Sequence, residues 1–179
     1  KNFSVSATFK YLFSDMGRIG NSRGASSVAF DLGVLYKCGI NDWEGAGWSV
    51  GLHVSNLGPK INYLTSKDAL PATVKVGGAA DLPFLQMHKL TLTADLGYRL
   101  SPADVQALSV SAGAEYAWRE LVMLRGGYHC GDKKKGDASY ATAGAGVEYA
   151  GVRLDFAWLF AGHEYLARNT FWVSLGYSF

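Results

Sequence analysis

Apolar and polar residues alternate along most of this chain with a period of two, which is typical of β-strands. Between Lys89 and Leu100, for example, leucine, alanine and tyrosine alternate with Thr91, Thr93, Asp95 and Arg99. Ten stretches alternate in this way and are separated by turn signals, so we predict ten strands. They are expected at residues 2–14, 25–37, 47–56, 71–81, 88–100, 107–118, 121–129, 141–149, 152–160 and 170–179.

The two faces of these strands predict two different surroundings. One face is apolar throughout and carries aromatic residues near both ends of the strands, whereas the other is built from glycine, serine, threonine and single charges. Lipid outside and a polar lumen inside would select this pattern. We therefore predict an all-β fold: a single domain over residues 1–179 that forms a transmembrane, antiparallel, up-and-down β-barrel in a bacterial outer membrane.

Composition excludes several other classes of protein. With 49% hydrophobic and 18% charged residues, the chain is not of the disordered type. It contains no run of about 18 apolar residues, so no transmembrane helix is expected. The formal net charge is only +2 and basic residues form no patch, so we expect no nucleic-acid partner.

The connections between the strands predict an orientation. Very short turns are expected at residues 119–120 and 150–151, and longer, more polar loops at 14–24, 57–70, 130–140 and 161–169. Short turns face the periplasm in such barrels and long loops face outward. Two connections depart from this rule, because 38–46 is long for a turn and 101–106 is short for an outer loop.

Charges of both signs fall on the predicted inward face. They are expected to form ion pairs across the wall, with a permeation path as the alternative interpretation. The candidate lumen-facing residues are Lys10, Asp31, Lys75, Asp95, Arg99, Glu115, Arg125, Glu148, Arg153 and Asp155.

The sequence gives little support for catalysis. Its four histidines fall in different segments without the spacing of metal ligands, and no Ser, His and acid set is evident, although folding could assemble one. We expect no enzyme activity, no metal and no cofactor. Cys38 and Cys130 fall at opposite ends of the predicted strands, so they are not expected to form a disulfide.

Several motifs resemble a known family of outer-membrane barrels. The stretch Val54–Tyr63 (VSNLGPKINY) followed by Leu70–Gly78 (LPATVKVGG) resembles the NLGPKI…LP…G signature of the PorV/PorQ family in the FadL superfamily. Within that family the similarity is to the PorV proteins of the type IX secretion system. Further similar stretches are 31–36, 124–128 with 135–136 and 143–147, and 154–159 with 166–170.

The resemblance implies a barrel of 14 strands, whereas ten are predicted here. The simplest explanation is that this chain supplies the C-terminal ten; the alternatives are a standalone barrel of ten strands and a barrel closed together with another chain. It implies a shuttle that binds the C-terminal domain of secreted cargo and passes it from a large translocon barrel to surface attachment proteins. The superfamily alone would imply a transporter for hydrophobic small molecules, which is the alternative function.

Partner contacts are expected on the outer loops, because loops on a rigid scaffold commonly carry recognition. A solvated loop over lipopolysaccharide and outer-membrane lipid is the simpler interpretation. The candidate partner-binding residues are Pro59, Lys60, Ile61, Tyr63, Leu64, Lys133, Lys134 and Lys135.

Overall fold

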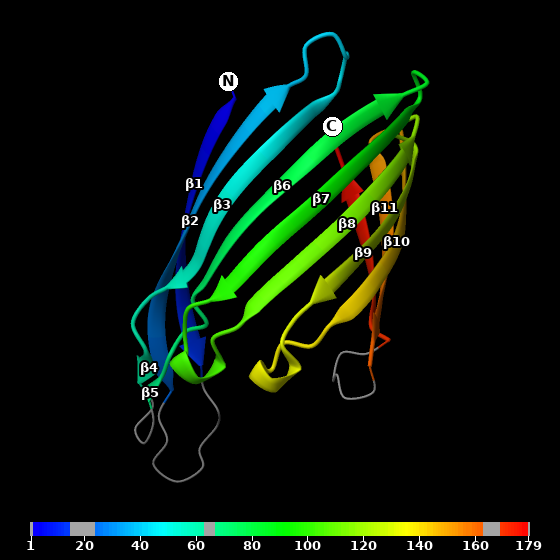
Figure 1. The fold of residues 1–179 in the computed structure, drawn as a ribbon. Helices are drawn as coiled ribbons and strands as arrows, with labels where there is room; N and C mark the ends of the chain where they lie inside the picture. Colours follow the sequence, from blue (N-terminus) through cyan, green and yellow to red (C-terminus); the bar gives the residue numbers. More distant parts are fainter. Residues whose placement is uncertain (1, 15–23, 63–66, 163–168, 179) are drawn as a thin grey trace.

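Ten long strands form one antiparallel sheet in the computed structural model, which describes residues 2–14, 24–62, 67–162 and 169–178 (Figure 1). The strands are β1 (Phe3–Ser14), β2 (Ala25–Gly39), β3 (Gly47–Leu57), β6 (Thr73–Phe84), β7 (His88–Arg99), β8 (Leu108–Trp118), β9 (Val122–Cys130), β10 (Tyr140–Tyr149), β11 (Val152–Ala161) and β12 (Phe171–Tyr177). Each pairs with the next along the chain. The remaining elements are the small pair β4 (Ile61–Asn62) and β5 (Lys67–Asp68) and two 3₁₀ turns, η1 (Ala103–Val105) and η2 (Lys133–Lys135).

The ten predicted strands are confirmed, and apart from two larger differences their bounds agree to within two residues. β6 continues to Phe84, beyond the predicted end at Asp81, because its register with β7 is unbroken from Thr73 to Phe84. The second difference is the pair β4–β5, which lies inside the connection that the sequence predicts as an irregular loop. Strands of two residues are too short to show an alternation of apolar and polar residues, so no sequence pattern predicts them.

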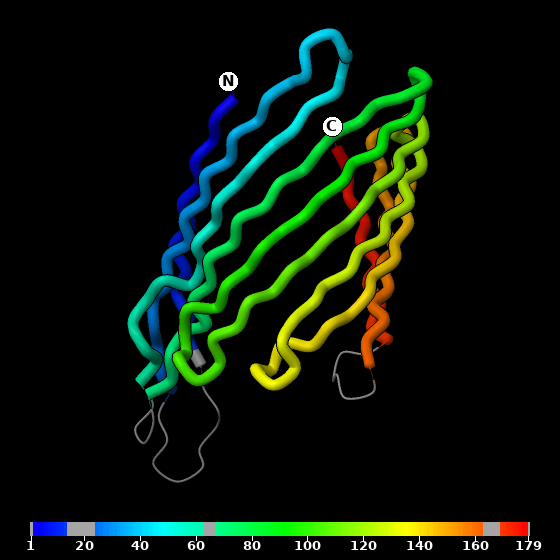
Figure 2. Tube along the Cα trace, in the orientation of Figure 1, coloured from blue at the N-terminus to red at the C-terminus, as the bar shows by residue number. Residues whose placement is uncertain are grey.

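The sheet is curved, and its strands run obliquely (Figure 2). β1 and β12 form its edges, and within the described residues β1 pairs only with β2 and β12 only with β11. Closure of the sheet into a barrel therefore stays a prediction. No helix in the described part of the chain is long and apolar enough to cross a membrane.

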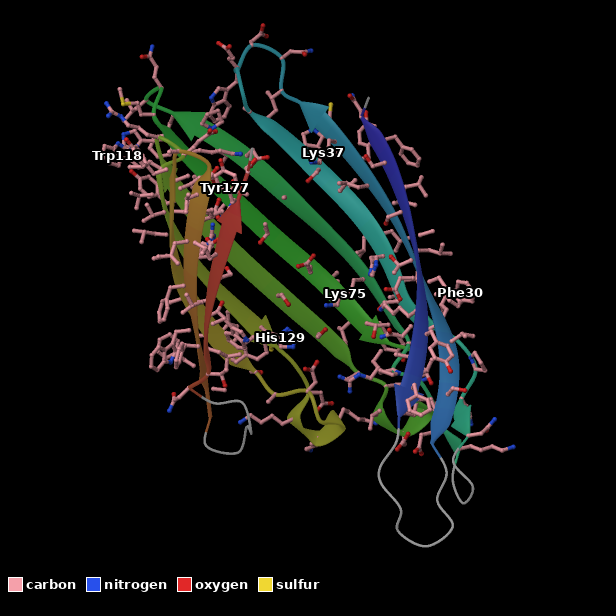
Figure 3. All side chains as sticks on the ribbon, turned by 180° about the vertical axis from the view of Figure 1, so that it is seen from behind. Phe30, Lys37, Lys75, Trp118, His129 and Tyr177 are labelled. Carbon is pink, nitrogen blue, oxygen red and sulfur yellow. The ribbon has the colours of Figure 1, made fainter. Side chains whose placement is uncertain are left out.

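The convex face of the sheet is apolar and the concave face is polar. Figure 3 shows Phe30 and Trp118 pointing outward, while Lys75 and His129 lie within the curve. Apolar side chains on the convex face are largely exposed, among them Phe9 at 62% and Leu124 at 55%. The buried apolar residues of the described part are mostly alanines, so no conventional core covers this face.

Short turns and long loops lie at opposite ends of the sheet, as the sequence predicts (Figure 1). Arg119 and Glu120 have φ values of 53° and 56°, and Ala150 and Gly151 have values of 50° and 80°. Two successive residues with positive φ are the signature of type I′ turns, whose twist matches that of the paired strands. Both short connections are therefore tight hairpins. Cys38 and Cys130 are free thiols, also as predicted.

Candidate partner-binding site at the loop end

The segment that follows β3 folds over the concave face of β2. The Ser27 hydroxyl donates a hydrogen bond to the Pro59 carbonyl at 3.0 Å. Gly58 lies so close to β2 that a Cβ atom added there would overlap the Val28 carbonyl oxygen and come within 3.2 Å of the Ala29 Cα. This part of the predicted outer loop therefore begins inside the curve, packed on the wall.

Asn56 fixes the point at which this segment leaves the sheet. The register of β2 and β3 shifts beside it, and its φ is 56°, a conformation that asparagine tolerates better than most residues. Its backbone N–H donates to Asp31 Oδ1 at 2.8 Å, and its side-chain amide donates to the Pro71 carbonyl at 3.1 Å. Lys10 donates to Asn56 Oδ1 at 3.1 Å and pairs with Asp31 at 2.6 Å. We call Lys10, Asp31 and Asn56 the Asn56 network.

The predicted contact residues of this segment differ in their surroundings. Pro59 and Lys60 are exposed, and Ile61 is half-buried in β4. Tyr63 and Leu64 lie outside the described residues. The exposed positions thus sit on a segment whose base is held by the Asn56 network.

A second loop, residues 131–139, contains the three predicted lysines. Lys133 and Lys134 are exposed in η2, and the backbone N–H of Lys134 donates to Asp132 Oδ1 at 2.9 Å. Arg99 donates to the Lys135 carbonyl at 3.2 Å, and Lys135 Nζ donates to the Asp104 carbonyl at 3.3 Å. The loop with η2 is therefore joined to the neighbouring loop with η1.

His129 connects the same loop to the sheet through its ring nitrogens. Its Nδ1 lies 2.9 Å from the Ser111 hydroxyl and its Nε2 lies 3.0 Å from Asp137 Oδ1, while the Tyr140 ring stacks on it at 4.8 Å. These residues form a Ser, His and acid set that was not identified from the sequence. The pairing of Ser111 with His129 in the strand register is the signal that could have revealed it.

The order of contacts in this set differs from that of a serine hydrolase. In such enzymes the acid holds Nδ1 and the serine faces Nε2, whereas here Ser111 faces Nδ1 and Asp137 faces Nε2. We therefore assign His129 a structural role, in which Ser111 donates to Nδ1 and Nε2–H donates to Asp137.

Half of the predicted lumen-facing charges meet in one chain of ion pairs on the concave face. Arg125 on β9 contacts Glu115 on β8 and Asp155 on β11. Arg153 then pairs with Asp155 at 2.8 Å and with Glu148 at 3.7 Å. These contacts link four neighbouring strands across the wall.

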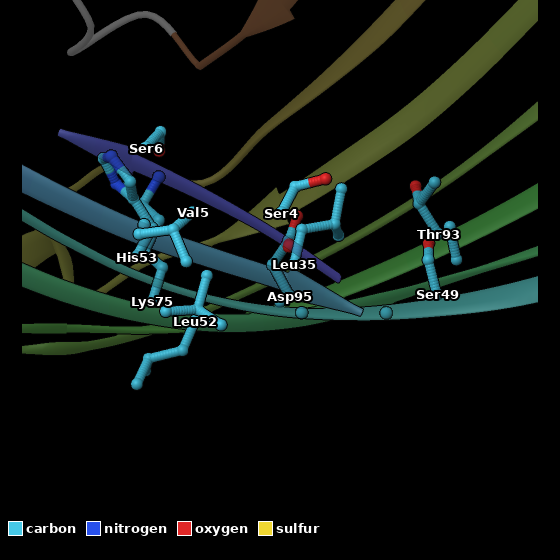
Figure 4. A pocket seen from close by; sticks show the side chains of 16 residues that line it. Ser4, Val5, Ser6, Leu35, Ser49, Leu52, His53, Lys75, Thr93 and Asp95 are labelled. Carbon is cyan, nitrogen blue, oxygen red and sulfur yellow. The ribbon is translucent and has the colours of Figure 1, made fainter. Parts of the chain in front are cut away.

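Lys75 and Asp95 instead line an open cavity of about 600 Å³ on the concave side of β1, β2, β3, β6 and β7 (Figure 4). Gly51 and Gly77, which are paired directly in the register, also line the cavity. Neither Lys75 nor Asp95 forms a salt bridge with any other described residue. His53 and the hydroxyls of Ser4, Ser6, Ser49 and Thr93 complete the polar lining.

Among the described residues no group of three or more His, Cys, Asp and Glu side chains could hold a metal ion. The end of the sheet with the long loops, here called the loop end, carries exposed ammonium groups and a proline-containing segment. Both lie on loops held to the sheet by hydrogen bonds.

Comparison with known proteins identifies a family. The family model described as "Type IX secretion system protein PorV" matches residues 1–106, which include β1 to β7 and η1. No match to a curated protein was found.

Gly58→Ala is expected to push the segment off β2, because the new methyl group would meet backbone atoms that cannot rotate away. Overpacking of this kind costs about 1–3 kcal/mol, so hydrogen exchange of residues 57–62 should accelerate. Gly126→Ala is the matched control, since nothing lies within 4 Å of a Cβ at that position. Equal exchange in both variants would show that the close packing of Gly58 does not hold the segment.

His129→Phe is expected to loosen the loop 131–139 while keeping the ring stack on Tyr140. It removes two hydrogen bonds, each worth about 1 kcal/mol, so amide exchange in the loop should rise about thirtyfold. Asp137→Asn, which still offers an acceptor to Nε2, serves as the conservative control. Unchanged exchange in His129→Phe would contradict the fastening role.

Proposed function

Because this chain belongs to the PorV family of type IX secretion system proteins, we propose that its sheet forms part of a β-barrel that spans the outer membrane. The family match over residues 1–106 is the observation that carries this proposal. The exposed apolar side chains of the convex face support it, because lipid would cover them. The short turns then face the periplasm and the long loops face outward.

A barrel requires partners for both edges of the sheet. In a bilayer, unpaired backbone groups find no water, so an open sheet edge is not tolerated there. β1 and β12 present such edges. We propose that further strands, from the same protein or from another chain, pair with them, as the expected 14-strand barrel requires.

The proposed activity is that of a shuttle for secreted proteins. The protein would bind the C-terminal domain of its cargo at the loop end, receive it from the large translocon barrel and pass it to surface attachment proteins. This role needs recognition without bond chemistry, and loops fastened to a rigid sheet suit recognition because less entropy is lost on binding. The described contact residues proposed for it are Pro59, Lys60, Ile61, Lys133, Lys134 and Lys135.

Transport of hydrophobic small molecules is the second candidate function. The cavity of about 600 Å³ on the concave face is the observation in its favour. Its hydroxyl groups, Lys75 and Asp95 oppose it, since burying an apolar ligand against unpaired charges is unfavourable. The shuttle is therefore the better supported function.

If cargo binds at the loop end, charge changes in the long loops should alter which proteins copurify with this protein. The full-length protein would be isolated from detergent-solubilised outer membranes, and the bound proteins identified by mass spectrometry. Wild type should retain the translocon barrel and secreted proteins that share a C-terminal domain. The double variant Lys133→Glu/Lys134→Glu should lose most of the cargo, because both side chains are exposed and reversal creates repulsion toward acidic partner groups.

Asp42→Lys/Glu44→Lys reverses two exposed charges at the opposite end and is the matched control. It should copurify cargo as wild type does. Equal loss in both double variants would contradict recognition at the loop end. Recovery of wild type with bound lipid or fatty acid but without any protein would favour the transporter instead.

A further inference from the structure

An unusual apolar surface lies at the short-turn end, where β6 meets β7 and β8 meets β9. Hairpin turns are usually built from glycine, proline and polar residues. Here the first turn carries Leu85 and Met87, exposed at 78% and 45%, directly after Phe84 at 41%. Leu85 is the most exposed of the large apolar side chains in the described part of the chain. An exposed apolar surface of this kind marks a site of contact.

The two turns are bonded to each other. The backbone N–H of Arg119 donates to the Met87 carbonyl at 2.6 Å, and Arg119 Nε lies 3.0 Å from Met87 Sδ. Below them His88 stacks on Phe84, with ring centroids 5.4 Å apart, and its Nδ1 lies 2.6 Å from the Tyr116 hydroxyl. The apolar tip is thus held in place by bonds and ring contacts on both hairpins.

Arg119 places a guanidinium group at this tip. The Arg119 guanidinium lies 5.3 Å from the centre of the Trp118 ring, and Figure 3 shows Trp118 pointing away from the concave face. Among the described residues Arg119 forms no salt bridge, although Glu120 follows it in the chain. Stacking on a ring uses the face of the guanidinium and leaves N–H groups at its edge available to an anion.

We propose that Arg119 binds the phosphate of a phospholipid headgroup, with Phe84, Leu85 and Met87 lying along the acyl chains. Two observations favour lipid over a protein as the occupant. Phe84 and Trp118, both exposed, lie on either side of His88 in the register and join the apolar tip to the exposed convex face. The charge is also complementary, because guanidinium and phosphate form paired, charge-assisted hydrogen bonds. The inference rests on the proposed insertion into the outer membrane.

The site would anchor this end of the barrel at the boundary between headgroups and hydrocarbon. Tryptophan and arginine are residues that hold membrane proteins at this depth. Because the tip is formed by turns rather than strands, it would fix how far the sheet enters the membrane.

Lipid binding can be measured on the detergent-solubilised full-length protein by native mass spectrometry during titration with dimyristoylphosphatidylglycerol. Wild type should retain bound lipid, and Arg119→Gln should weaken its apparent affinity by about tenfold, the effect of losing charge-assisted hydrogen bonds. Leu85→Asn, which suits a residue with a φ of 50°, should also weaken it by removing contact with the acyl chain. Lys134→Gln removes an equal charge at the other end and should bind as wild type.

Three results would overturn the inference. Equal retention of lipid by wild type and Arg119→Gln would do so, as would full competition by inorganic phosphate, which would indicate an ion site without a lipid. A protein crosslinked to a photoreactive residue at position 85 in native membranes, with no lipid adduct, would replace lipid by a protein partner. Arg119→Lys, which keeps the charge, checks that any loss is not caused by misfolding.

The results that would contradict the proposed function differ from those that would contradict the headgroup site. If wild type does not insert into phospholipid vesicles at all, the membrane barrel itself is wrong, whatever Arg119 does. Insertion of wild type and of Arg119→Gln with the same lipid retention would reject only the headgroup site.

Discussion

Backbone pairing between neighbouring strands is the constraint from which the rest of this structure follows. Because each strand sends successive side chains to opposite faces, the register across the ten strands, which shifts locally between β2 and β3, sorts their side chains into two surfaces. A shift of one residue in any pair would turn phenylalanine and leucine inward and lysine and aspartate outward. The tight type I′ hairpins and the unbroken registers from β6 to β12 prevent such a shift.

The same register explains how the concave face holds its charges. Arg125 is the direct register partner of Glu115, and it reaches Asp155 across β10, where Gly146 leaves the space that a Cβ would take beside Asp155. The Asn56 network works differently, since it depends on a local shift between β2 and β3. There the chain leaves the regular pattern, and the segment that resembles the family signature packs back onto the wall.

The long strands and both short turns were predictable from the sequence, because alternation over ten or so residues leaves little ambiguity. The loop end was predictable only in part. Pro59 and Lys133 were correctly placed in connections, but nothing local indicates that Gly58 packs on β2 or that Arg99 bonds to the loop with η2. The trio around His129 was missed for the same reason, since its members come together only through strand pairing and a loop that folds back.

The central claim is that this sheet spans an outer membrane with its short turns toward the periplasm. Thiol labelling of intact cells tests it most directly, in a full-length protein that carries Cys38→Ser and Cys130→Ser and a single new cysteine. The account predicts that a membrane-impermeant maleimide labels Lys134→Cys on intact cells and Gln86→Cys only after the outer membrane is permeabilised. Labelling of Gln86→Cys on intact cells, or equal labelling of both positions, would contradict it.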